Sequence, residues 1–435
     1  MPLDQAAQET LIARDIVVAV VAVGVTLVAG LVALNLKRGE KRIEQTIPRL
    51  YDTADPQFSR AMGVLLGPPI VQGNRFDVLL NGDEIFPAML LAIRNARKTI
   101  NFESYIYWSG SIGREFADAL SERARSGVKV RVLLDWLGSN KLDKEQLDTM
   151  KRAGVDVRRF HEPVWYHLDR INNRTHRKEL IVDGRIGFTG GVGIADQWTG
   201  HAEDPEHWRD THFRAEGPVV AQMQAVFLDN WMKVTGEVLH SDEYFPALAE
   251  SGGGAGQMFS SSPQGGSESM QLMYLLAITA AAKSIHLSSA YFVPDDLALK
   301  ALVAAAKRGV RIQIITPGKH MDAETVRRAS RARWGDLLAA GIEIFEYQPT
   351  MYHCKVMIVD ALWVSVGSTN FDSRSFSLND EANLNISDQP FAERQVAIFQ
   401  QDLARSRQIT LSEWQQRPIM EKLLEHSAAL LRHQL

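Results

Sequence analysis

The longest apolar run of the chain lies near its N-terminus. Residues 16–36 carry no ionisable side chain over 21 positions, and a helix of that length can cross a hydrocarbon core of about 30 Å. We expect a transmembrane helix over 16–36, preceded by an N-terminal tail over 1–15. A secretory signal peptide is the alternative, but such peptides begin with a basic region. Here three acidic residues and a single arginine precede the run, which favours the anchor.

The charges that follow the apolar run predict its orientation. Four Lys and Arg side chains within 37–42 outweigh Glu40, and such residues flank a span on its cytoplasmic side. We assign 37–72 to a juxtamembrane segment. The remaining chain is expected to be a cytoplasmic body, held at the inner cell membrane by a single pass.

Beyond residue 72 the pattern of apolar and polar positions occurs twice. In each half a helix-length segment ends at a glycine, Gly127 or Gly309, and a β-branched strand-like run follows, at 128–134 or 310–315. Alternating helices and strands predict parallel strands joined by crossover helices. We expect an α/β fold of two pseudo-twofold-related domains, each a mixed, mostly parallel sheet flanked by helices.

The same patterns set the expected domain boundaries. The two domains are expected at 73–248 and 269–410. Glycine and serine are frequent in 249–268, which predicts a flexible interdomain linker. Leucines in 411–435 recur at helical spacing and predict a C-terminal amphipathic helix. This helix could dock on the body or contact the membrane, and we favour docking.

Composition narrows the classes of function. The chain has 435 residues, 45% of them hydrophobic and 23% charged, which is typical of a globular protein. Its one cysteine, Cys354, excludes an intramolecular disulfide and a zinc site built from several thiolates. We interpret Cys354 as a small buried hydrophobe. The formal net charge of −4 argues against bulk electrostatic binding of nucleic acid, so no nucleic-acid partner is expected.

One motif with the spacing H-x-K-x4-D occurs at the same point of both halves. Its two copies are His176, Lys178, Asp183 and His353, Lys355, Asp360. Two chance matches among the twelve histidines would have a probability of about 0.001. Residues two apart on a strand share a face, so each histidine should stand beside its lysine. The aspartates have the opposite parity and are expected to support the site.

Two imidazoles and two ammonium groups suit phosphodiester transfer. One histidine can attack phosphorus and form a phosphohistidine while the other protonates the departing alkoxide. The lysines can hold the non-bridging oxygens in the transition state, a role in which they can replace a metal ion. We therefore expect no metal and no other cofactor, and an activity that survives chelators.

Other polar residues are candidates for completing this site. Asp210 and Glu381 follow the two motifs at similar distances and could orient the histidines through the second ring nitrogen. Ser368 and Asn370 follow the second motif and could donate hydrogen bonds to a phosphate. A rival set of histidines and aspartates could be interpreted as a metal site, but its spacing fits neither a helix nor a strand throughout. That set is His201, Asp204, His207, Asp210 and His212.

The sequence resembles the phospholipase D superfamily, whose paired HKD motifs are matched by HRKELIVD at His176 and HCKVMIVD at His353. From Gly73 onward it is similar to bacterial cardiolipin synthases, in segments such as LLNGDEIFPAMLLAI, ESYIY and GVKVRVLLDWLGS. The resemblance implies two phospholipase D domains. It also implies a phosphatidyltransferase that moves phosphatidyl between phosphatidylglycerol molecules and releases glycerol. His176 would be the nucleophile and His353 the acid.

The chain departs from the family pattern in one motif. The element G-[SG]-x-N occurs as Gly190-Gly191-Val192-Gly193, so the first half lacks the asparagine that Asn370 supplies in the second. A single predicted span is a further departure from the two spans, or none, of many such synthases. Both departures bear on the substrate and the acceptor.

Three alternative functions follow from the same residues. A phospholipase D hydrolase would release phosphatidic acid, because water would resolve the same intermediate. A nuclease of the superfamily would have a basic body and no span. A catalytically inactive membrane scaffold would have damaged motifs, whereas all six HKD positions are intact.

One further sequence feature leaves two interpretations open. Glu103, Tyr105 and Tyr107 alternate along the strand expected before the first motif, so they could edge a lipid pocket or pack in the core. The oligomeric state is not predicted.

Overall fold

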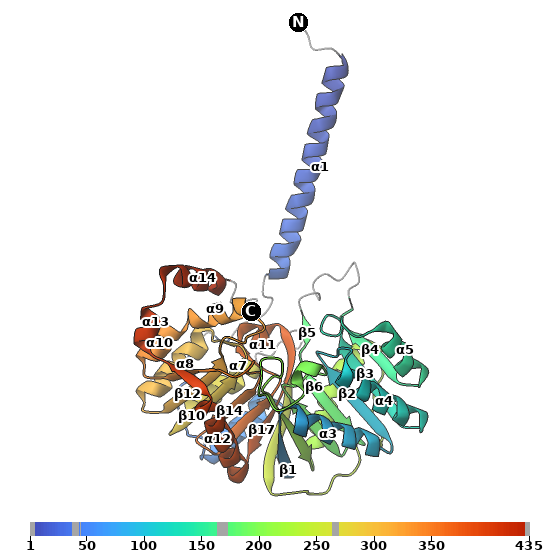
Figure 1. Cartoon of the computed structure of the whole chain (residues 1–435), viewed down its shortest axis with the longest axis vertical. Helices are drawn as coiled ribbons and strands as arrows, with labels where there is room; N and C mark the ends of the chain where they lie inside the picture. The colour runs from blue at the N-terminus through green and yellow to red at the C-terminus, as the bar shows by residue number, and fades with distance from the viewer. Residues whose placement is uncertain (1–4, 37–42, 44, 163–172, 263–268, 431–435) are drawn as a thin grey trace.

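The computed structural model describes residues 5–36, 43, 45–162, 173–262 and 269–430. An N-terminal helix, α1 (Gln5–Leu36), projects from a rounded body in Figure 1. The helix expected over 16–36 is confirmed, although it begins within the expected tail, at Gln5. Its most apolar window, Ala13–Gly30, has a mean hydropathy of 2.0 and is wholly exposed, so α1 is long and apolar enough to cross a membrane.

The body contains one continuous sheet in which the two halves meet edge to edge. In the first half the strands are β1 (Val71–Leu80), β2 (Thr99–Ser104), β3 (Lys129–Asp135), β4 (Asp156–Phe160), β6 (Lys178–Val182), β7 (Ile186–Gly190) and β8 (Thr211–Glu216). In the second half they are β9 (Gly254–Ser261), β10 (Ser284–Ser289), β12 (Arg311–Pro317), β13 (Glu343–Tyr347), β14 (Lys355–Val359), β15 (Trp363–Gly367) and β17 (Asn379–Ser387). Four short strands complete the described set, namely β5 (Arg174–Thr175), β11 (Phe292–Val293), β16 (Phe371–Asp372) and β18 (Ser406–Ile409).

The order of the strands confirms the predicted duplication. The path through the sheet is β18-β13-β12-β10-β14-β15-β17-β9-β1-β8-β7-β6-β2-β3-β4, and it reads almost the same from both ends. Strands β2, β3 and β4 pair in parallel, as do β10, β12 and β13. The remaining pairs along this path are antiparallel. Each half is thus a mixed sheet, as expected, but its antiparallel pairs outnumber its two parallel ones, so the expectation of mostly parallel strands is wrong. The hairpins at β6–β7 and β14–β15 add antiparallel strands to the parallel core of each half. The pseudo-twofold axis passes between β9 and β1.

Helices cover both faces of the sheet. In the first half they are α3 (Asn81–Asn95), α4 (Ser111–Arg125), α5 (Lys144–Arg152) and α6 (Val219–Thr235), together with a short 3-10 helix at Asp196–Trp198. In the second half they are α7 (Ser269–Ala280), α8 (Asp296–Lys307), α9 (Glu324–Arg331), α10 (Trp334–Ala339), α11 (Ser373–Ser377) and α12 (Gln389–Ala404). Helices α6 and α12 cover one face with an apolar core drawn from both halves. The other face carries a separate core in each half.

Gly127 and Gly309 follow the ends of their helices, as the sequence predicts. Helices α4 and α8 end two residues before Gly127 and Gly309, and both glycines have φ +93. A left-handed backbone of this kind suits glycine, which has no Cβ, and it turns the chain into the following strand.

The predicted linker over 249–268 is wrong in part. Its residues Gly254–Ser261 form β9, a strand at the centre of the sheet that pairs with β17 on one side and β1 on the other. Glycine is needed there because the ring of Phe76 lies 2.8 Å from a Cβ placed at Gly254 and 2.7 Å from one at Gly256. The expected flexibility at 263–268 lies outside the described residues.

Two further boundaries differ from expectation. Part of the juxtamembrane segment, α2 (Pro56–Leu65), belongs to the body and packs on the core of the second half through Phe58 and Met62. The single C-terminal helix is instead two short helices, α13 (Leu411–Gln415) and α14 (Ile419–Ala429), because Pro418 interrupts the helical pattern.

Candidate active site

The two HKD histidines lie where the halves exchange backbone hydrogen bonds. Strand β5, directly before His176, pairs with the start of β17 in the second half, and the His176 N–H donates to the Asp380 carbonyl at 2.8 Å. The segment before His353 pairs in turn with Arg209 of the first half, whose carbonyl accepts the His353 N–H at 2.8 Å. Each histidine is thereby held against the opposite half.

The two candidate orienting carboxylates bind the histidines crosswise. The Nδ1 atom of His176 lies 3.0 Å from both carboxylate oxygens of Glu381, a residue of the second half. The Nδ1 atom of His353 lies 2.7 Å from Oδ2 of Asp210, a residue of the first half. Both carboxylates are fully buried. The structure therefore brings both candidates to the histidines, and each one serves the partner half.

The lysines stand beside the histidines as strand parity predicts. The Lys178 ammonium donates to the backbone carbonyl of His176 at 2.8 Å. The Lys355 ammonium donates to the carbonyl of His353 at 2.7 Å and lies 3.2 Å from Nε2 of the same ring. Both lysines are buried. Two cations are therefore concentrated where an anion would neutralise them.

Burial dominates the protonation of these groups. It lowers the pKa of His176 to about 4, with the raising effect of Glu381 second and the lowering effect of Lys178 third. Burial and then the charge of Lys355 lower the pKa of His353 to about 3. Burial and the charge of Lys355 also lower the pKa of Lys178 to about 7. An anionic phosphate among these groups would oppose every one of these shifts.

The carboxylates remain ionised at neutral pH. Burial alone would raise the pKa of Asp210, but the charges of His353 and Lys355 and the hydrogen bonds outweigh it, so the pKa is lowered. The pKa of Glu381 is lowered in the same way, chiefly by His176 against the effect of burial. An ionised carboxylate can only accept, so each neutral imidazole donates its Nδ1–H. Nε2 then carries the lone pair, which can attack phosphorus or accept a proton.

The two HKD aspartates lie apart from this cluster. Asp183 and Asp360 follow the far ends of β6 and β14 and adopt left-handed conformations in the hairpin turns, with φ of 53 and 55. The carboxylate of Asp183 accepts the backbone N–H groups of 97–99, and that of Asp360 accepts those of 282–284. The structure gives both aspartates a role in joining the hairpin to the neighbouring strand.

The two halves support their carboxylates with different donors. The Ser368 hydroxyl donates to Glu381 at 2.5 Å, so it orients the carboxylate, whereas the sequence predicted a phosphate donor. The matching residue of the first half is Gly191, where a Cβ would lie 2.3 Å from Asp210. Here the indole Nε1–H of Trp198 donates to Oδ2 of Asp210 at 3.0 Å. Trp198 therefore takes the place of the missing hydroxyl.

The departure at Gly193 has a steric basis. A Cβ at this position would lie 2.8 Å from the Cβ of Ile106 and 3.3 Å from the indole of Trp198. The asparagine of the family motif therefore has no room in the first half. In the second half Asn370 is buried, and its side-chain oxygen has no hydrogen-bond partner among the described residues. An amide oxygen accepts hydrogen bonds and does not donate them, so the role of Asn370 as a phosphate donor stays a prediction.

Aromatic rings surround both histidines. The ring centroid of Tyr105 lies 5.2 Å from that of His176, and Trp198 and Trp208 lie 5.3 and 5.5 Å from His353. Of the three alternating residues, only Tyr105 borders the site. Glu103 faces α6 and accepts from Asn230 at 2.8 Å, and Tyr107 is a core residue. The alternation ends because β2 stops at Ser104.

The rival set of histidines and aspartates is dispersed. His207 pairs with Asp204 at 2.7 Å on the surface, and His201 pairs with Asp83. His212 is buried, and burial lowers its pKa to about 4. Within residues 5–36, 43, 45–162, 173–262 and 269–430, no three His, Cys, Asp or Glu side chains form a group able to hold a metal ion. Cys354 is buried as expected.

Sequence reasoning missed Trp198 and the pair formed by Tyr291 and Asp322. The Tyr291 hydroxyl donates to Asp322 at 2.8 Å, and the charges of Asp322 and Lys355 stabilise each other. The sequence shows that a glycine stands at 191 where the second half has a serine, but this difference does not identify Trp198 as the replacement. No spacing along the chain points to Asp322.

Comparison with known proteins identifies the family of the chain. A family model described as "Cardiolipin synthase, PLD-like domain" matches residues 89–231 and 274–403. The chain is 38% identical over 357 residues to cardiolipin synthase 2 of Bacillus anthracis, an alignment covering 81% of this chain and 69% of the relative. It is 36% identical over 367 residues to a cardiolipin synthase of Geobacillus kaustophilus, covering 83% and 73%.

A solved structure shares the fold. Phosphatidylserine synthase from Haemophilus influenzae Rd KW20 superposes with a TM-score of 0.65 and 17% identity, over 87% of this chain and 100% of that chain. At this identity the likeness concerns the fold. The family match and the sequence relatives confirm the resemblance that the paired HKD motifs carry, and the chain belongs to the cardiolipin synthase family of phospholipase D-like proteins.

Proposed function

We propose that this chain is a membrane-anchored phosphatidyltransferase of the cardiolipin synthase type, which joins two phosphatidylglycerol molecules and releases glycerol. The observation that carries the proposal is the crossed pairing of His176 with Glu381 and of His353 with Asp210. It provides two buried imidazoles with equivalent partners, as a two-step displacement requires. The names of the relatives supply the substrate class, since both are cardiolipin synthases.

In the first step Nε2 of His176 attacks the phosphorus of one phosphatidylglycerol. The bond from phosphorus to the glycerol oxygen breaks, and the departing oxygen takes a proton from Nε2 of His353. The products are phosphatidyl-His176 and free glycerol. Lys178 and Lys355 hold the non-bridging oxygens, whose charge must be stabilised in the transition state.

In the second step a glycerol hydroxyl of a second phosphatidylglycerol attacks the same phosphorus. His353, now neutral, accepts the hydroxyl proton, and the bond from phosphorus to His176 breaks. Cardiolipin leaves, His176 is free again, and His353 carries the proton that it had at the start of the first step. The assignment of His176 as nucleophile follows the family resemblance, because both histidines have similar surroundings.

The low pKa of His353 means that the bound substrate must help to protonate this residue before the first step. A pKa of about 3 leaves the free imidazole neutral near pH 7, yet the first step needs it protonated. The negative charge of a bound phosphodiester favours the imidazolium. We therefore expect His353 to take up a proton when the substrate enters, so that the acid forms only beside its substrate.

The experiment that tests the proposal supplies the full chain in vesicles with labelled phosphatidylglycerol alone. Cardiolipin and glycerol in equal amounts are expected, and the variant His176→Ala should form neither. A chelator should leave the rate unchanged. Phosphatidic acid as the sole phosphorus-containing product would reject transfer and establish the hydrolase, because water would then resolve the intermediate.

The orientation of the body is part of the proposal. The Lys and Arg side chains within 37–42 support a cytoplasmic body at the inner membrane, with α1 as its single pass. Protease added outside intact spheroplasts should leave a C-terminal tag uncut, and added to lysed spheroplasts should remove it. Cleavage of the tag in intact spheroplasts would reverse the orientation.

A further inference from the structure

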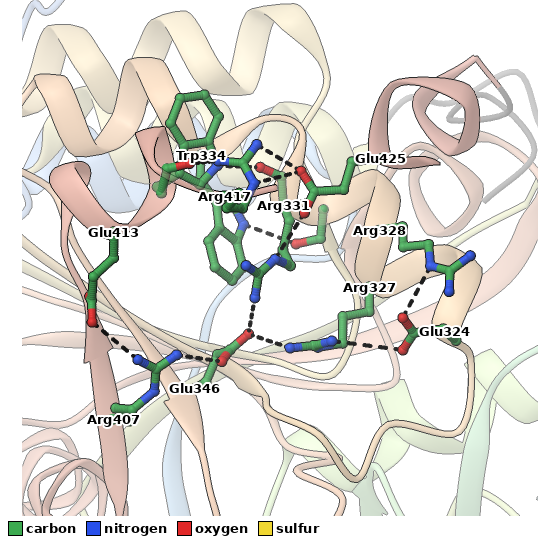
Figure 2. Close-up of polar contacts among 12 residues, drawn as sticks. Glu324, Arg327, Arg328, Arg331, Trp334, Glu346, Arg407, Glu413, Arg417 and Glu425 are labelled. Carbon is green, nitrogen blue, oxygen red and sulfur yellow. Dashed lines mark hydrogen bonds and ion pairs between the residues drawn. The ribbon is translucent and has the colours of Figure 1, made fainter. Parts of the chain in front are cut away.

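The C-terminal helix α14 is attached to the body through its polar side. The buried carboxylate of Glu425 accepts from Nε of Arg331 at 3.0 Å and from Nε of Arg417 at 2.9 Å. Arg331 also binds Glu346 at 3.1 Å, and Figure 2 shows Arg331 between the two glutamates. The guanidinium of Arg417 stacks on Trp414 at 4.0 Å. These contacts fix which side of α14 faces the body.

The opposite side of α14 is apolar and exposed. Large hydrophobic side chains there are 42–83% exposed, namely Ile419, Met420, Leu423, Leu424 and Leu430. Their spacing places them on one face of the helix. The buried residues Glu425 and Ala428 lie on the other. The amphipathic helix predicted from the sequence therefore docks, but with its apolar face outward, where such side chains are costly in water.

The helix lies beside the rim of the site. Ala428 packs with Val293, Val326 and Ala329, in a cluster that also contacts Tyr291. Tyr291 holds Asp322, whose charge acts on Lys355. Few contacts therefore separate α14 from the reacting groups.

The transmembrane helix leaves the body at the same end. Figure 1 shows α14 and α9 at the end of the body from which α1 projects, together with β5, the strand directly before His176. If α1 crosses a bilayer, that end of the body faces the bilayer surface. An amphipathic helix lying flat there would bury its apolar face among the lipid headgroups and upper acyl chains.

We propose that the exposed face of α14 is a membrane-contact surface whose occupant is the lipid bilayer that α1 crosses. The surface consists of Ile419, Met420, Leu423, Leu424 and Leu430. It gives the body a second attachment and directs the site rim toward the lipid. The inference rests on the location of α1 and α14 and stands apart from the identity of the reaction.

Depth-dependent quenching tests the proposal on the full chain. The variant Leu423→Cys is labelled with an environment-sensitive fluorophore, while Cys354 stays unlabelled because it is 2% exposed. The protein is reconstituted in vesicles of phosphatidylcholine and phosphatidylglycerol. Lipid with a doxyl group near the headgroup should quench the label and shift its emission to the blue. Retention of activity shows that the labelled protein is folded.

Val64→Cys is the matched control. Val64 is an exposed aliphatic residue of α2, and α2 precedes the start of β1, which pairs with the end of β8 farthest from Asp210. Its label should show neither quenching nor a shift. Equal quenching at the two positions, or none at Leu423, would overturn the proposal. A blue shift that rises with protein concentration in detergent would also overturn it, since a second copy would then cover the face.

A second measurement separates membrane contact from catalysis. Met420→Glu and Leu423→Glu together should lower turnover of phosphatidylglycerol in vesicles, and Val64→Glu should not. The same double variant should match the unmodified chain on phosphatidylglycerol dissolved in detergent micelles. An equal loss of turnover in vesicles and in micelles would contradict a role for α14 at the bilayer. This outcome does not depend on whether the product is cardiolipin.

Discussion

The exchange of carboxylates between the halves predicts that two similar substitutions will have different effects. Asp210→Asn removes the charged partner of His353, and Glu381→Gln removes that of His176. If His353 is the acid that protonates the leaving group, Asp210→Asn should slow only reactions whose leaving group needs a proton. Glu381→Gln should slow every reaction, because the nucleophile is affected.

The expected magnitude follows from the hydrogen bond that each substitution weakens. Asp210 is fully buried and accepts from His353 Nδ1 at 2.7 Å. A hydrogen bond between charged groups contributes about 1.5–3 kcal/mol, and a tenfold change in rate corresponds to about 1.4 kcal/mol. Asp210→Asn should therefore slow the release of glycerol by about 10- to 150-fold. Glu381→Gln should have an effect in the same range.

The assay compares two leaving groups in a single turnover. Phosphatidylglycerol releases glycerol, a poor leaving group, whereas a phosphatidyl ester of p-nitrophenol releases a phenolate that needs no proton. With the second substrate the burst of p-nitrophenolate should remain near the rate of the unmodified enzyme in Asp210→Asn and should fall in Glu381→Gln. Only the first step is observed, so a role of His353 in the second step does not interfere.

Asp204→Asn provides the matched control for these substitutions. Asp204 also accepts from a histidine, His207, at 2.7 Å, but this pair is at the surface. Both rates should stay unchanged in this variant. Equal slowing of the two substrates by Asp210→Asn would refute the reasoning, and so would p-nitrophenolate release in Glu381→Gln at the unmodified rate.

Three other predictions follow from the site. Trp198→Phe keeps an aromatic ring but removes the 3.0 Å hydrogen bond to Asp210, at a cost of about 0.5–1.5 kcal/mol. Steady-state turnover should therefore fall about 2- to 12-fold. An unchanged rate and pH profile would exclude a positioning role for Trp198. The pKa of His353 is about 3 when folded and about 6.5 when unfolded, so the unfolded chain takes up a proton first. Stability should be full above about pH 6.5 and fall toward pH 3, by up to about 1.4 kcal/mol per pH unit for this residue. Urea denaturation at several pH values should show that the free energy of unfolding of His353→Gln falls less steeply with decreasing pH than that of the unmodified chain. Equal slopes for the two proteins would contradict the assignment of this pH dependence to His353. Asp360→Asn weakens the hydrogen bonds from the backbone N–H groups of 282–284 and should lower the free energy of unfolding by about 1–3 kcal/mol. Turnover per folded molecule should stay unchanged. A loss of turnover without a loss of stability would show that Asp360 takes part in the reaction.

The sequence predicts the fold well where the signal is local. The apolar run of α1, the glycine stops and the β-branched runs depend on neighbouring residues, and all of them appear in the structure. The linker prediction fails at 254–261 because glycine and serine also occur in strands where a bulky neighbour needs space. There Phe76 occupies the space that side chains would fill. Such a requirement comes from a residue far away in the chain.

The candidate site shows the same division. The histidines, the lysines and both carboxylates could be found from motif spacing, since each half repeats the order. The sequence could not show which carboxylate orients which histidine, because the pairing of β5 with β17 depends on how the halves meet. Trp198 was missed for a similar reason. It supplies a hydrogen bond that a serine supplies in the other half, and no motif links the two residue types.

The exchange of partners also explains why the two halves must act together. One half alone would contain a buried histidine and lysine without the carboxylate that lies against the imidazole, and an unpaired cation in that setting is unfavourable. The imidazolium that forms during the reaction would lack its counter-charge. Because Asp210 serves His353 and Glu381 serves His176, a displacement of one half relative to the other would disturb both steps. Precise docking of the halves along β9 and β1 is therefore a condition for turnover, and β9 can contribute to it only as a paired strand.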